Sequence, residues 1–261
     1  MSMHKSGGSL TQSSLLLTGP AMQEGHVRQI INLTQTTSGS YLLLSSLDIS
    51  RRNLALRGKE AFAQVVKLAD YAREEINEIG GYYAFSKEII NGDSVFDFDR
   101  TKLSVNTLNV GLAGIEVYDL LRDEYDIQIE FGDLGNFLAY LSIGDRPREV
   151  ERLVSALSEV RRRFGKPDGL MRQEYIEPEV VLSPQDAFYA EKTSLPLEET
   201  AGHVCSEFVM CYPPGIPILA PGERITERIV EYIQYAKEKG CSMTGPEDPD
   251  IRRLNVLKGV Y

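Results

Sequence analysis

Four residues near the start of the chain, Ser2-Met3-His4-Lys5, are of the types that covalent cofactor chemistry needs. A lysine offers a primary amine on a flexible stem, and such an amine can form a Schiff base with a cofactor aldehyde. The stretch 6–14 that follows is rich in glycine and hydroxyl side chains, which suit a phosphate together with backbone N–H groups and an imidazole. The pattern therefore indicates a Schiff-base lysine at Lys5. Taken alone, a His-Lys pair near a chain end is more often a solvated tail.

The composition is that of a globular protein with enough chain for more than one compact unit. The 261 residues are 42% hydrophobic and 25% charged, and the net charge is -10. An acidic chain argues against nucleic acid or an anionic membrane as the main partner and is compatible with cationic substrates. The longest apolar runs are too short to cross a bilayer, and the start lacks the order of a signal peptide. We therefore expect neither a membrane segment nor a secretion signal.

The three cysteines give no sign of a metal site. Cys205, Cys211 and Cys241 form no C-x-x-C pair, and only one histidine, His203, lies near them in sequence. We therefore expect no zinc or other metal centre. An odd number of cysteines without a secretion signal is typical of a reducing compartment, so the predicted localisation is cytoplasmic.

Residues 1–92 are predicted to belong to an α/β domain. The stretch 35–41 is a polar loop crowded with hydroxyls, and 41–52 resumes an apolar periodicity that favours a helix. A second helix is expected from Gly58, where apolar residues recur at helical spacing until Gly80-Gly81 ends it. The hydroxyls of the loop could hold a phosphate, including that of a neighbouring subunit, or serve only as turn residues.

Residues 93–165 are predicted to form a smaller α/β unit. A short strand is expected at 102–106 and a helix at 114–125. The stretch 127–131 alternates strictly between apolar and polar residues, which predicts a strand with one wet face. The run 137–143 is more continuously apolar, which predicts a strand buried on both faces. A helix that begins near a proline and ends at a glycine completes this unit.

Residues 166–261 are expected to form a third unit after a linker rich in glycine and proline. Ser183 can cap a helix whose first residue is Pro184. The segment 212–223 contains four prolines, which exclude a helix and a central strand. Such a stiff segment suits the wall of a binding site, although a plain connection is the more common role. A helix is predicted at 224–239.

Five stretches, in order along the chain, resemble the ornithine/lysine/arginine decarboxylase family of pyridoxal 5′-phosphate (PLP) enzymes, which have the aminotransferase-like fold. Each stretch is a weak motif by itself, but together they span nearly the whole chain. The stretches are Ser2-Met3-His4-Lys5, Leu10-Thr11-Gln12-Ser13-Ser14, Gln35-Thr36-Thr37-Ser38-Gly39-Ser40-Tyr41-Leu42-Leu43, Ser183-Pro184-Gln185-Asp186-Ala187-Phe188, and Tyr212-Pro213-Pro214-Gly215-Ile216-Pro217 with Pro221-Gly222-Glu223.

The resemblance implies roles for four residues. Lys5 would carry PLP as the catalytic Schiff-base lysine, and Ser2 and His4 would contact the cofactor phosphate. Thr36 would reach the phosphate bound in the partner subunit of a homodimer or higher oligomer. The sequence departs from the family at three positions. Met3 stands where the family often has Thr, Gly39 where it usually has Pro, and Leu17 where several members carry His.

The resemblance also implies the fold and its division. The chain would be α/β, with the C-terminal part of an aminotransferase-like PLP-binding large domain at 1–92. A small α/β domain would follow at 93–165 and an α+β decarboxylase C-terminal domain at 166–261. In this family an Asp pairs with the cofactor pyridine nitrogen and a His stacks on the ring, both well before the lysine in sequence. Because the sequence has neither before Lys5, we expect a C-terminal portion that is inactive by itself.

The activity implied by the resemblance is PLP-dependent decarboxylation of a basic amino acid. Arginine, giving agmatine and carbon dioxide, is favoured because the compact last third resembles that of the smaller biosynthetic members; lysine and ornithine stay open. A distal cation on the substrate needs a carboxylate, and Glu207 and Glu223 beside the proline segment are the candidates. Two alternatives also stay open. One is a non-catalytic remnant that dimerises with a full-length relative, and the other is a different lyase or an aminotransferase of the same fold.

Overall fold

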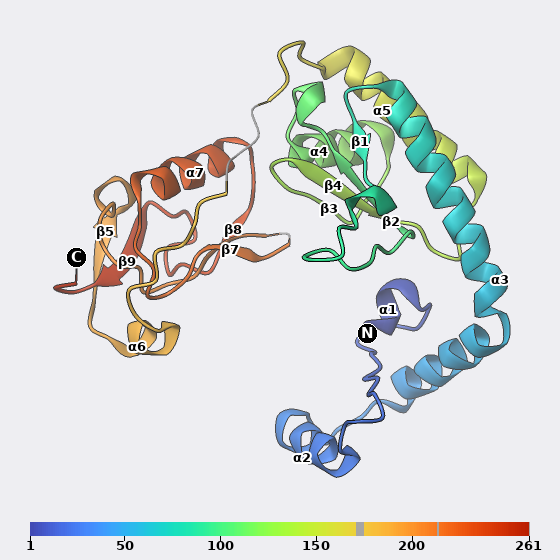
Figure 1. Ribbon diagram of the computed structural model, residues 1–261, viewed down its shortest axis with the longest axis horizontal. Coiled ribbons are helices and arrows are strands. Elements are labelled where there is room, and N and C mark those ends of the chain that lie inside the picture. Colours follow the sequence, from blue (N-terminus) through green and yellow to red (C-terminus); the bar gives the residue numbers. More distant parts are fainter. Residues whose placement is uncertain (171–174, 213, 261) are drawn as a thin grey trace.

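The computed structural model describes residues 1–170, 175–212 and 214–260, which form a mixed set of helices and strands. Figure 1 shows the long helix α3 along one edge, a small sheet beside it, and a second group of strands with α7 farther away on the same side, beyond that sheet. In these residues the helices are α1 (Met3–Ser6), α2 (Glu24–Thr34), α3 (Tyr41–Ile79), α4 (Gly114–Tyr125), α5 (Pro147–Phe164), α6 (Pro184–Tyr189) and α7 (Glu227–Glu238). Short 3₁₀ turns lie at Lys87–Ile89, Leu108–Val110 and Leu197–Glu199. The strands are β1 (Tyr83–Ala84), β2 (Lys102–Asn106), β3 (Phe131–Gly132), β4 (Asn136–Tyr140), β5 (Lys192–Pro196), β6 (Val209–Cys211), β7 (Ile216–Leu219), β8 (Met243–Thr244) and β9 (Arg253–Leu257).

Helix α3 is one continuous helix of 39 residues, where the sequence predicted two. Gly58 does not interrupt it, because one glycine inside a helix costs only about 1 kcal/mol relative to alanine. The helix ends as predicted at Gly80, whose φ of +78° favours glycine. No helix among the described residues is long and apolar enough to cross a membrane.

The two halves of α3 lie in different surroundings. The second half packs into a core that includes Val65, Ala69, Ala72 and Ile76, with α5 alongside it (Figure 1). The first half, together with α2 before it, leaves most of its large apolar side chains exposed. These exposed side chains are Ile30, Leu33, Tyr41, Leu42, Leu44, Ile49 and Leu56.

The middle unit is an antiparallel sheet in the order β1-β2-β4-β3. Strand β2 and helix α4 have the predicted bounds, and α5 ends before Gly165 as predicted. Two strand predictions were wrong. The strand expected at 127–131 is reduced to β3, because the chain leaves α4 through a left-handed residue, Asp126, and pairs with β4 only from Glu130 onward. The strand expected to be buried on both faces, β4, alternates between buried and partly exposed residues, since helices cover one face of this sheet.

One hydrophobic core joins the second half of α3 to this sheet and to helices α4 and α5. Its members run from Val65 to Val160 in sequence. The packing is therefore continuous across residue 92, where the sequence placed a domain boundary. The division of the chain into 1–92, 93–165 and 166–261 stays a prediction.

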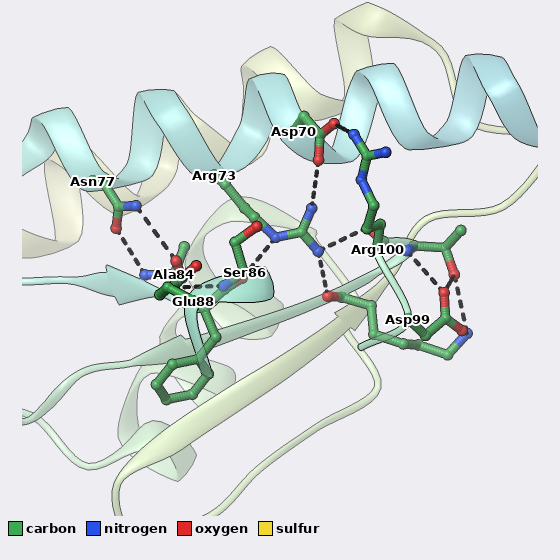
Figure 2. A network of polar contacts seen from close by, with 11 residues as sticks. Asp70, Arg73, Asn77, Ala84, Ser86, Glu88, Asp99 and Arg100 are labelled. Carbon is green, nitrogen blue, oxygen red and sulfur yellow. Dashed lines mark hydrogen bonds and ion pairs between the residues drawn. The ribbon is translucent and has the colours of Figure 1, made fainter. Parts of the chain in front are cut away.

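A buried arginine fixes α3 to the sheet (Figure 2). The side chain of Arg73 is 3% exposed and donates to the carbonyl oxygens of Phe85 at 2.7 Å, Arg100 at 2.7 Å and Lys102 at 2.6 Å. It also pairs with Asp70, which in turn pairs with the side chain of Arg100. Burial lowers the pKa of the Arg73 guanidinium, while Asp70 opposes that shift. We call these residues the Arg73 cluster.

The last unit contains a two-stranded sheet, β5-β9, and a three-stranded sheet in the order β7-β6-β8. Ser183 caps α6 as predicted, accepting from the Asp186 N–H at 3.2 Å. The proline-rich segment supplies β7 at the edge of its sheet, the place where a strand tolerates Pro217. Pro213, which belongs to the same predicted motif, lies outside the described residues. The core under α7 includes Leu197, Val209, Leu219, Ile225, Ile229, Ile233, Leu254 and Val256.

Candidate active site

Lys5 lies on a loop, residues 1–15, that is closed at its base by backbone hydrogen bonds. Ser2 and Ser14 form an isolated antiparallel bridge, and the Leu15 N–H donates to the carbonyl of Met1 at 2.9 Å. The one-turn helix α1 stands inside this loop and carries Lys5. The loop therefore gives the lysine a defined backbone even though its side chain is half exposed.

Met3 and Gly7 shape the loop from within. Met3 is 1% exposed, so the residue that departs from the family pattern is an apolar anchor here. A Cβ atom on Gly7 would lie 2.5 Å from the end of the Met3 side chain and 2.9 Å from the Met3 carbonyl oxygen, so another residue at position 7 would force the loop to shift. Gly8 has φ +83°, a conformation that also favours glycine. The Gly-Gly pair after the lysine is thus required by packing and by backbone conformation.

Two serines on α3 attach the loop to the long helix. The Leu10 N–H donates to the Ser46 hydroxyl at 2.7 Å, and the buried Ser50 hydroxyl donates to the Gly7 carbonyl. Both serines belong to the first half of α3, whose outer face is exposed. The position of Lys5 therefore depends on α3 as well as on its own loop.

The amine of Lys5 forms an ion pair with a carboxylate that is distant in sequence. Lys5 Nζ lies 2.7 Å from Glu130 Oε1, and the two side chains are 49% and 30% exposed. Hydrogen bonding and charge from Glu130 raise the pKa of Lys5 above its ordinary value, and Tyr140 and Tyr212 add smaller effects in the same direction. In this arrangement the amine is a charged ammonium at neutral pH.

Glu130 and Tyr140 also line a cavity of about 400 Å³ beside the sheet. Its lining combines apolar and polar side chains, as small-molecule sites commonly do. The apolar part includes Leu103, Ile129, Ala139, Val150 and Leu153. The carboxylate that binds Lys5 thus faces a space that is large enough for an amino-acid side chain.

Other residues named from the sequence lie on or near the loop. His4 Nδ1 is 3.0 Å from the Ser13 carbonyl, so in that contact the ring nitrogen must donate. Ser2 is exposed on the same loop. Thr36 is exposed between α2 and α3, where its hydroxyl accepts from the Ser38 N–H at 3.3 Å. The described residues include no contact between Thr36 and Lys5, and its predicted action in a partner subunit stays a prediction.

The two carboxylates predicted for substrate binding contact the backbone of the C-terminal unit. Glu207 accepts from the Asn255 N–H at 2.8 Å, from the Asn255 side-chain amide at 2.9 Å and from the Glu247 N–H at 2.9 Å. Glu223 accepts from the Ala220 N–H at 2.8 Å. Neither is among the charged groups that act on the pKa of Lys5. Their substrate role stays a prediction.

Sequence reasoning assigned no role to three residues that act on the Lys5 amine: Glu130, Tyr140 and Tyr212. Glu130 was seen only as part of an alternating strand with a wet face, and a wet-face glutamate is ordinarily solvated. A signal was present, because such a glutamate on a sheet edge is a candidate partner for a lysine that needs one. Its pairing with a residue 125 positions earlier could not be deduced from local spacing.

Solved structures of lysine decarboxylases share this fold. The lysine decarboxylase of Francisella novicida matches with a TM-score of 0.76 at 20% identity, over 98% of this chain and 48% of that chain. The constitutive lysine decarboxylase of Escherichia coli matches with a TM-score of 0.69 at 19% identity, over 96% of this chain and 48% of that chain. At these identities the likeness shows the fold alone, a mixed α/β arrangement.

Curated relatives and family models give the closer relationship. The arginine decarboxylase of Halalkalibacterium halodurans is 43% identical over 98% of this chain and 53% of the relative, and that of Bacillus subtilis is 40% identical over 98% and 54%. The chain therefore spans about half the length of these relatives. The major domain of Orn/Lys/Arg decarboxylases matches residues 1–109, and the C-terminal domain of the same family matches residues 169–249. On these matches, the chain belongs to the ornithine/lysine/arginine decarboxylase family.

Proposed function

We propose that the chain carries the reactive lysine of a PLP-dependent decarboxylase that acts on a basic amino acid, with arginine favoured over lysine and ornithine. The observation that carries this proposal is the placement of Lys5. Its amine is accessible, it stands on a loop with a defined backbone, and it faces a carboxylate beside a cavity. The names of the relatives, arginine decarboxylases at 40% and 43% identity, support arginine as the substrate.

The residues present fit the part of PLP that they would contact. An aldehyde needs an accessible primary amine, and the Lys5 side chain is half exposed. The phosphate would be held by the exposed Ser2 and by the ring of His4, whose orientation the Ser13 carbonyl fixes. When bound, PLP would supply the electron sink for the electrons that carbon dioxide leaves behind. Lys5 would hold the cofactor, position it, and move a proton at its own Nζ.

Thr36 and the exposed surface around it support a second subunit in the active assembly. Helix α2 buries none of its residues, and the first half of α3 exposes a series of leucines and isoleucines. Exposed apolar surface usually marks an interaction site where it is contiguous. We infer a homodimer or higher oligomer in which Thr36 contacts the phosphate of the partner's cofactor.

Two further proposals concern substrate selection and completeness. Glu207 or Glu223 would receive the distal cation of the substrate, which requires that one of them exchanges its backbone partners for that cation. The carboxylate that pairs with the pyridine nitrogen would come from a segment that the relatives have and the 261 residues do not include. Without that carboxylate the electron sink is weak, so the chain would not turn over substrate alone.

The decisive experiment separates attachment of the cofactor from turnover. The purified chain is mixed with PLP and reduced with borohydride, and the labelled peptide is mapped by mass spectrometry. A label on Lys5 that disappears in Lys5→Ala supports the proposal. Lys258→Ala is the matched control, because Lys258 is also an ion-paired, exposed lysine and its loss should leave the label unchanged.

Turnover is then measured as release of carbon dioxide from arginine, lysine and ornithine in turn. The chain is tested alone and with a second polypeptide that supplies the preceding half of a curated relative. Activity only in the second case, highest with arginine, is the expected result. Labelling of a lysine other than Lys5 would contradict the assignment. Labelling of Lys5 with no release from any of the three amino acids, even with the second polypeptide, would favour a non-catalytic remnant.

A further inference from the structure

The Lys5–Glu130 pair joins two parts of the fold that are otherwise separate in sequence. It is an ion pair between the loop of residues 1–15 and a residue at the edge of the sheet. Lys5 stands on the loop that α3 supports, whereas Glu130 immediately precedes β3. The bond length of 2.7 Å is that of a charge-assisted hydrogen bond.

The backbone of Glu130 is hydrogen-bonded to the sheet, while its carboxylate has few described contacts. The Glu130 N–H donates to the Leu138 carbonyl at 3.0 Å, which fixes the residue to the edge of the sheet. In contrast to Glu207, whose two oxygens accept three N–H bonds, the described contacts of the Glu130 side chain are to Lys5 alone. Such a carboxylate has a fixed position and is described in contact with one amine. It is therefore suited to bind that amine and to release it.

We propose that Glu130 is the positioning residue of Lys5. Its carboxylate, on a residue that lines the cavity, holds the uncombined lysine as an ammonium and receives it again whenever the amine is released. The role that this inference gives to Lys5 rests on the proposed function. The pairing of Lys5 with Glu130 can be tested without cofactor or substrate. The consequence for Lys5 is lower reactivity than that of an ordinary lysine until an aldehyde is bound beside it.

Other charged and titratable groups face the same amine. Tyr140 on β4 and Tyr212 after β6 both act on the Lys5 ammonium, and Lys102 lies 4.2 Å from the centroid of the Tyr140 ring. The effects of the two tyrosines on the pKa of Lys5 are smaller than that of Glu130. Glu130 is therefore the group whose neutralisation should change Lys5 most.

The test measures the neutral fraction of Lys5 directly. The full chain is methylated with formaldehyde and cyanoborohydride from about pH 8 to about pH 11, a range that brackets the ordinary lysine pKa. Only the neutral amine reacts, and mass spectrometry reads each lysine separately. Glu130→Gln should raise the rate at Lys5 about two- to fivefold below its pKa, as expected for the loss of a half-exposed ion pair. Glu130→Asp should recover part of the slow rate because it keeps the charge.

A matched control separates this effect from a general change of charge. Glu124 also forms a half-exposed ion pair, with Arg163, so Glu124→Gln removes the same charge elsewhere. It should leave the rate at Lys5 unchanged. If Glu130→Gln does not fold, high salt applied to the wild type provides the second measurement, because screening should raise the rate at Lys5 relative to the other lysines.

The outcomes keep the two proposals apart. Identical Lys5 profiles for wild type and Glu130→Gln, or no relative change at Lys5 with salt, would overturn the role of Glu130. The borohydride label with PLP is read on the same variants. A shifted Lys5 profile together with a label on a different lysine would keep the pairing and refute the Schiff-base role. An unshifted profile with a label on Lys5 would do the reverse.

Discussion

The Arg73 cluster and the Lys5–Glu130 pair both place a cation from one part of the fold against a carboxylate or carbonyl of another. Arg73 is buried, and its guanidinium donates to three backbone carbonyls and to Asp70. Lys5 is half exposed and has one described partner, Glu130. The two cations therefore differ in burial and in the number of their hydrogen-bond partners. A buried cation must have its donors satisfied, because an unpaired buried charge is costly, whereas a half-exposed cation can leave its partner at little cost.

This contrast distinguishes a structural charge from a charge that is available for chemistry. Figure 2 shows Arg73 pointing from α3 between Asp70 and Arg100, with its donors directed at the chain that leads into β2. Nothing could approach that guanidinium without removing the bonds that fix α3 to the sheet. The Lys5 amine, in contrast, reaches an aldehyde by giving up one ion pair.

The largest effect should come from Arg73→Met. The change removes the guanidinium donor from three partly buried carbonyl oxygens and one of the two arginines from Asp70. Loss of one partner from a buried charge network typically costs about 3–5 kcal/mol. Urea denaturation followed by circular dichroism should show that decrease in the free energy of unfolding. Arg100→Met, which removes a 41% exposed side chain from the same carboxylate, should cost about 1 kcal/mol or less. Equal costs for the two variants would abolish the distinction.

A second prediction asks to which side of the comparison Glu207 belongs. In Glu207→Gln an amide N–H must face one of the three N–H donors that the carboxylate accepts. We expect a loss of about 1–3 kcal/mol in the free energy of unfolding. Glu191→Gln, at an 84% exposed carboxylate, is the control and should change little. A stable Glu207→Gln variant with altered preference among arginine, lysine and ornithine would instead place Glu207 with the groups available for substrate.

A third prediction concerns the support of the Lys5 loop. Ser50→Ala removes the buried hydroxyl that donates to the Gly7 carbonyl and should cost about 0.5–1.5 kcal/mol. Amide hydrogen exchange in residues 1–15 should become faster, while the core around Val65 stays unchanged. Ser45→Ala, at an exposed position of the same helix, is the control. Unaltered exchange in the loop would mean that α3 does not hold it.

The smallest effect is a dependence on pH. The pKa of Lys5 is raised in the folded chain, so its pairing with Glu130 stabilises the fold below the unfolded lysine pKa of about 10.4 and is lost as pH rises through the folded value. The difference in unfolding free energy between wild type and Glu130→Gln should therefore be constant up to about pH 10 and then vanish. Denaturation curves at several pH values measure it. A difference that grows above pH 10 would have the wrong sign for this pair.

Periodicity in the sequence was sufficient for the elements that have one apolar face. Strand β2, helix α4 and the end of α5 were predicted at their observed bounds because their apolar residues meet a single core. It was insufficient for β4, where an apolar run suggested two buried faces. Helices cover one face of the antiparallel sheet, so alternate residues of that run are only partly buried. Local composition does not state how many layers a sheet will have.

The candidate site divides in the same way. Lys5 could be named as a candidate because an amine, hydroxyls and glycines stand in consecutive residues, and its catalytic role stays a prediction. Glu130 could not be named, since it meets Lys5 only after the chain has formed α3 and the sheet. The burial of Met3 could not be predicted from the sequence, because a methionine in a polar stretch is expected to be exposed. Its packing against Gly7 is visible only in the structure.

The unbroken helix α3 also has a mechanical meaning. The helix axis extends roughly 35 Å from Ser50 to Arg73, at 1.5 Å per residue. Ser50 is hydrogen-bonded to the Lys5 loop, and Arg73 is hydrogen-bonded to the sheet. A tilt of about 5° at the arginine would move the serine end by about 3 Å over that length. The ion pair between Lys5 and Glu130 is a second connection between the Lys5 loop and the sheet, and it opposes such a tilt of the helix. Forming or breaking the ion pair at the amine would therefore change how the Lys5 loop is held against the sheet.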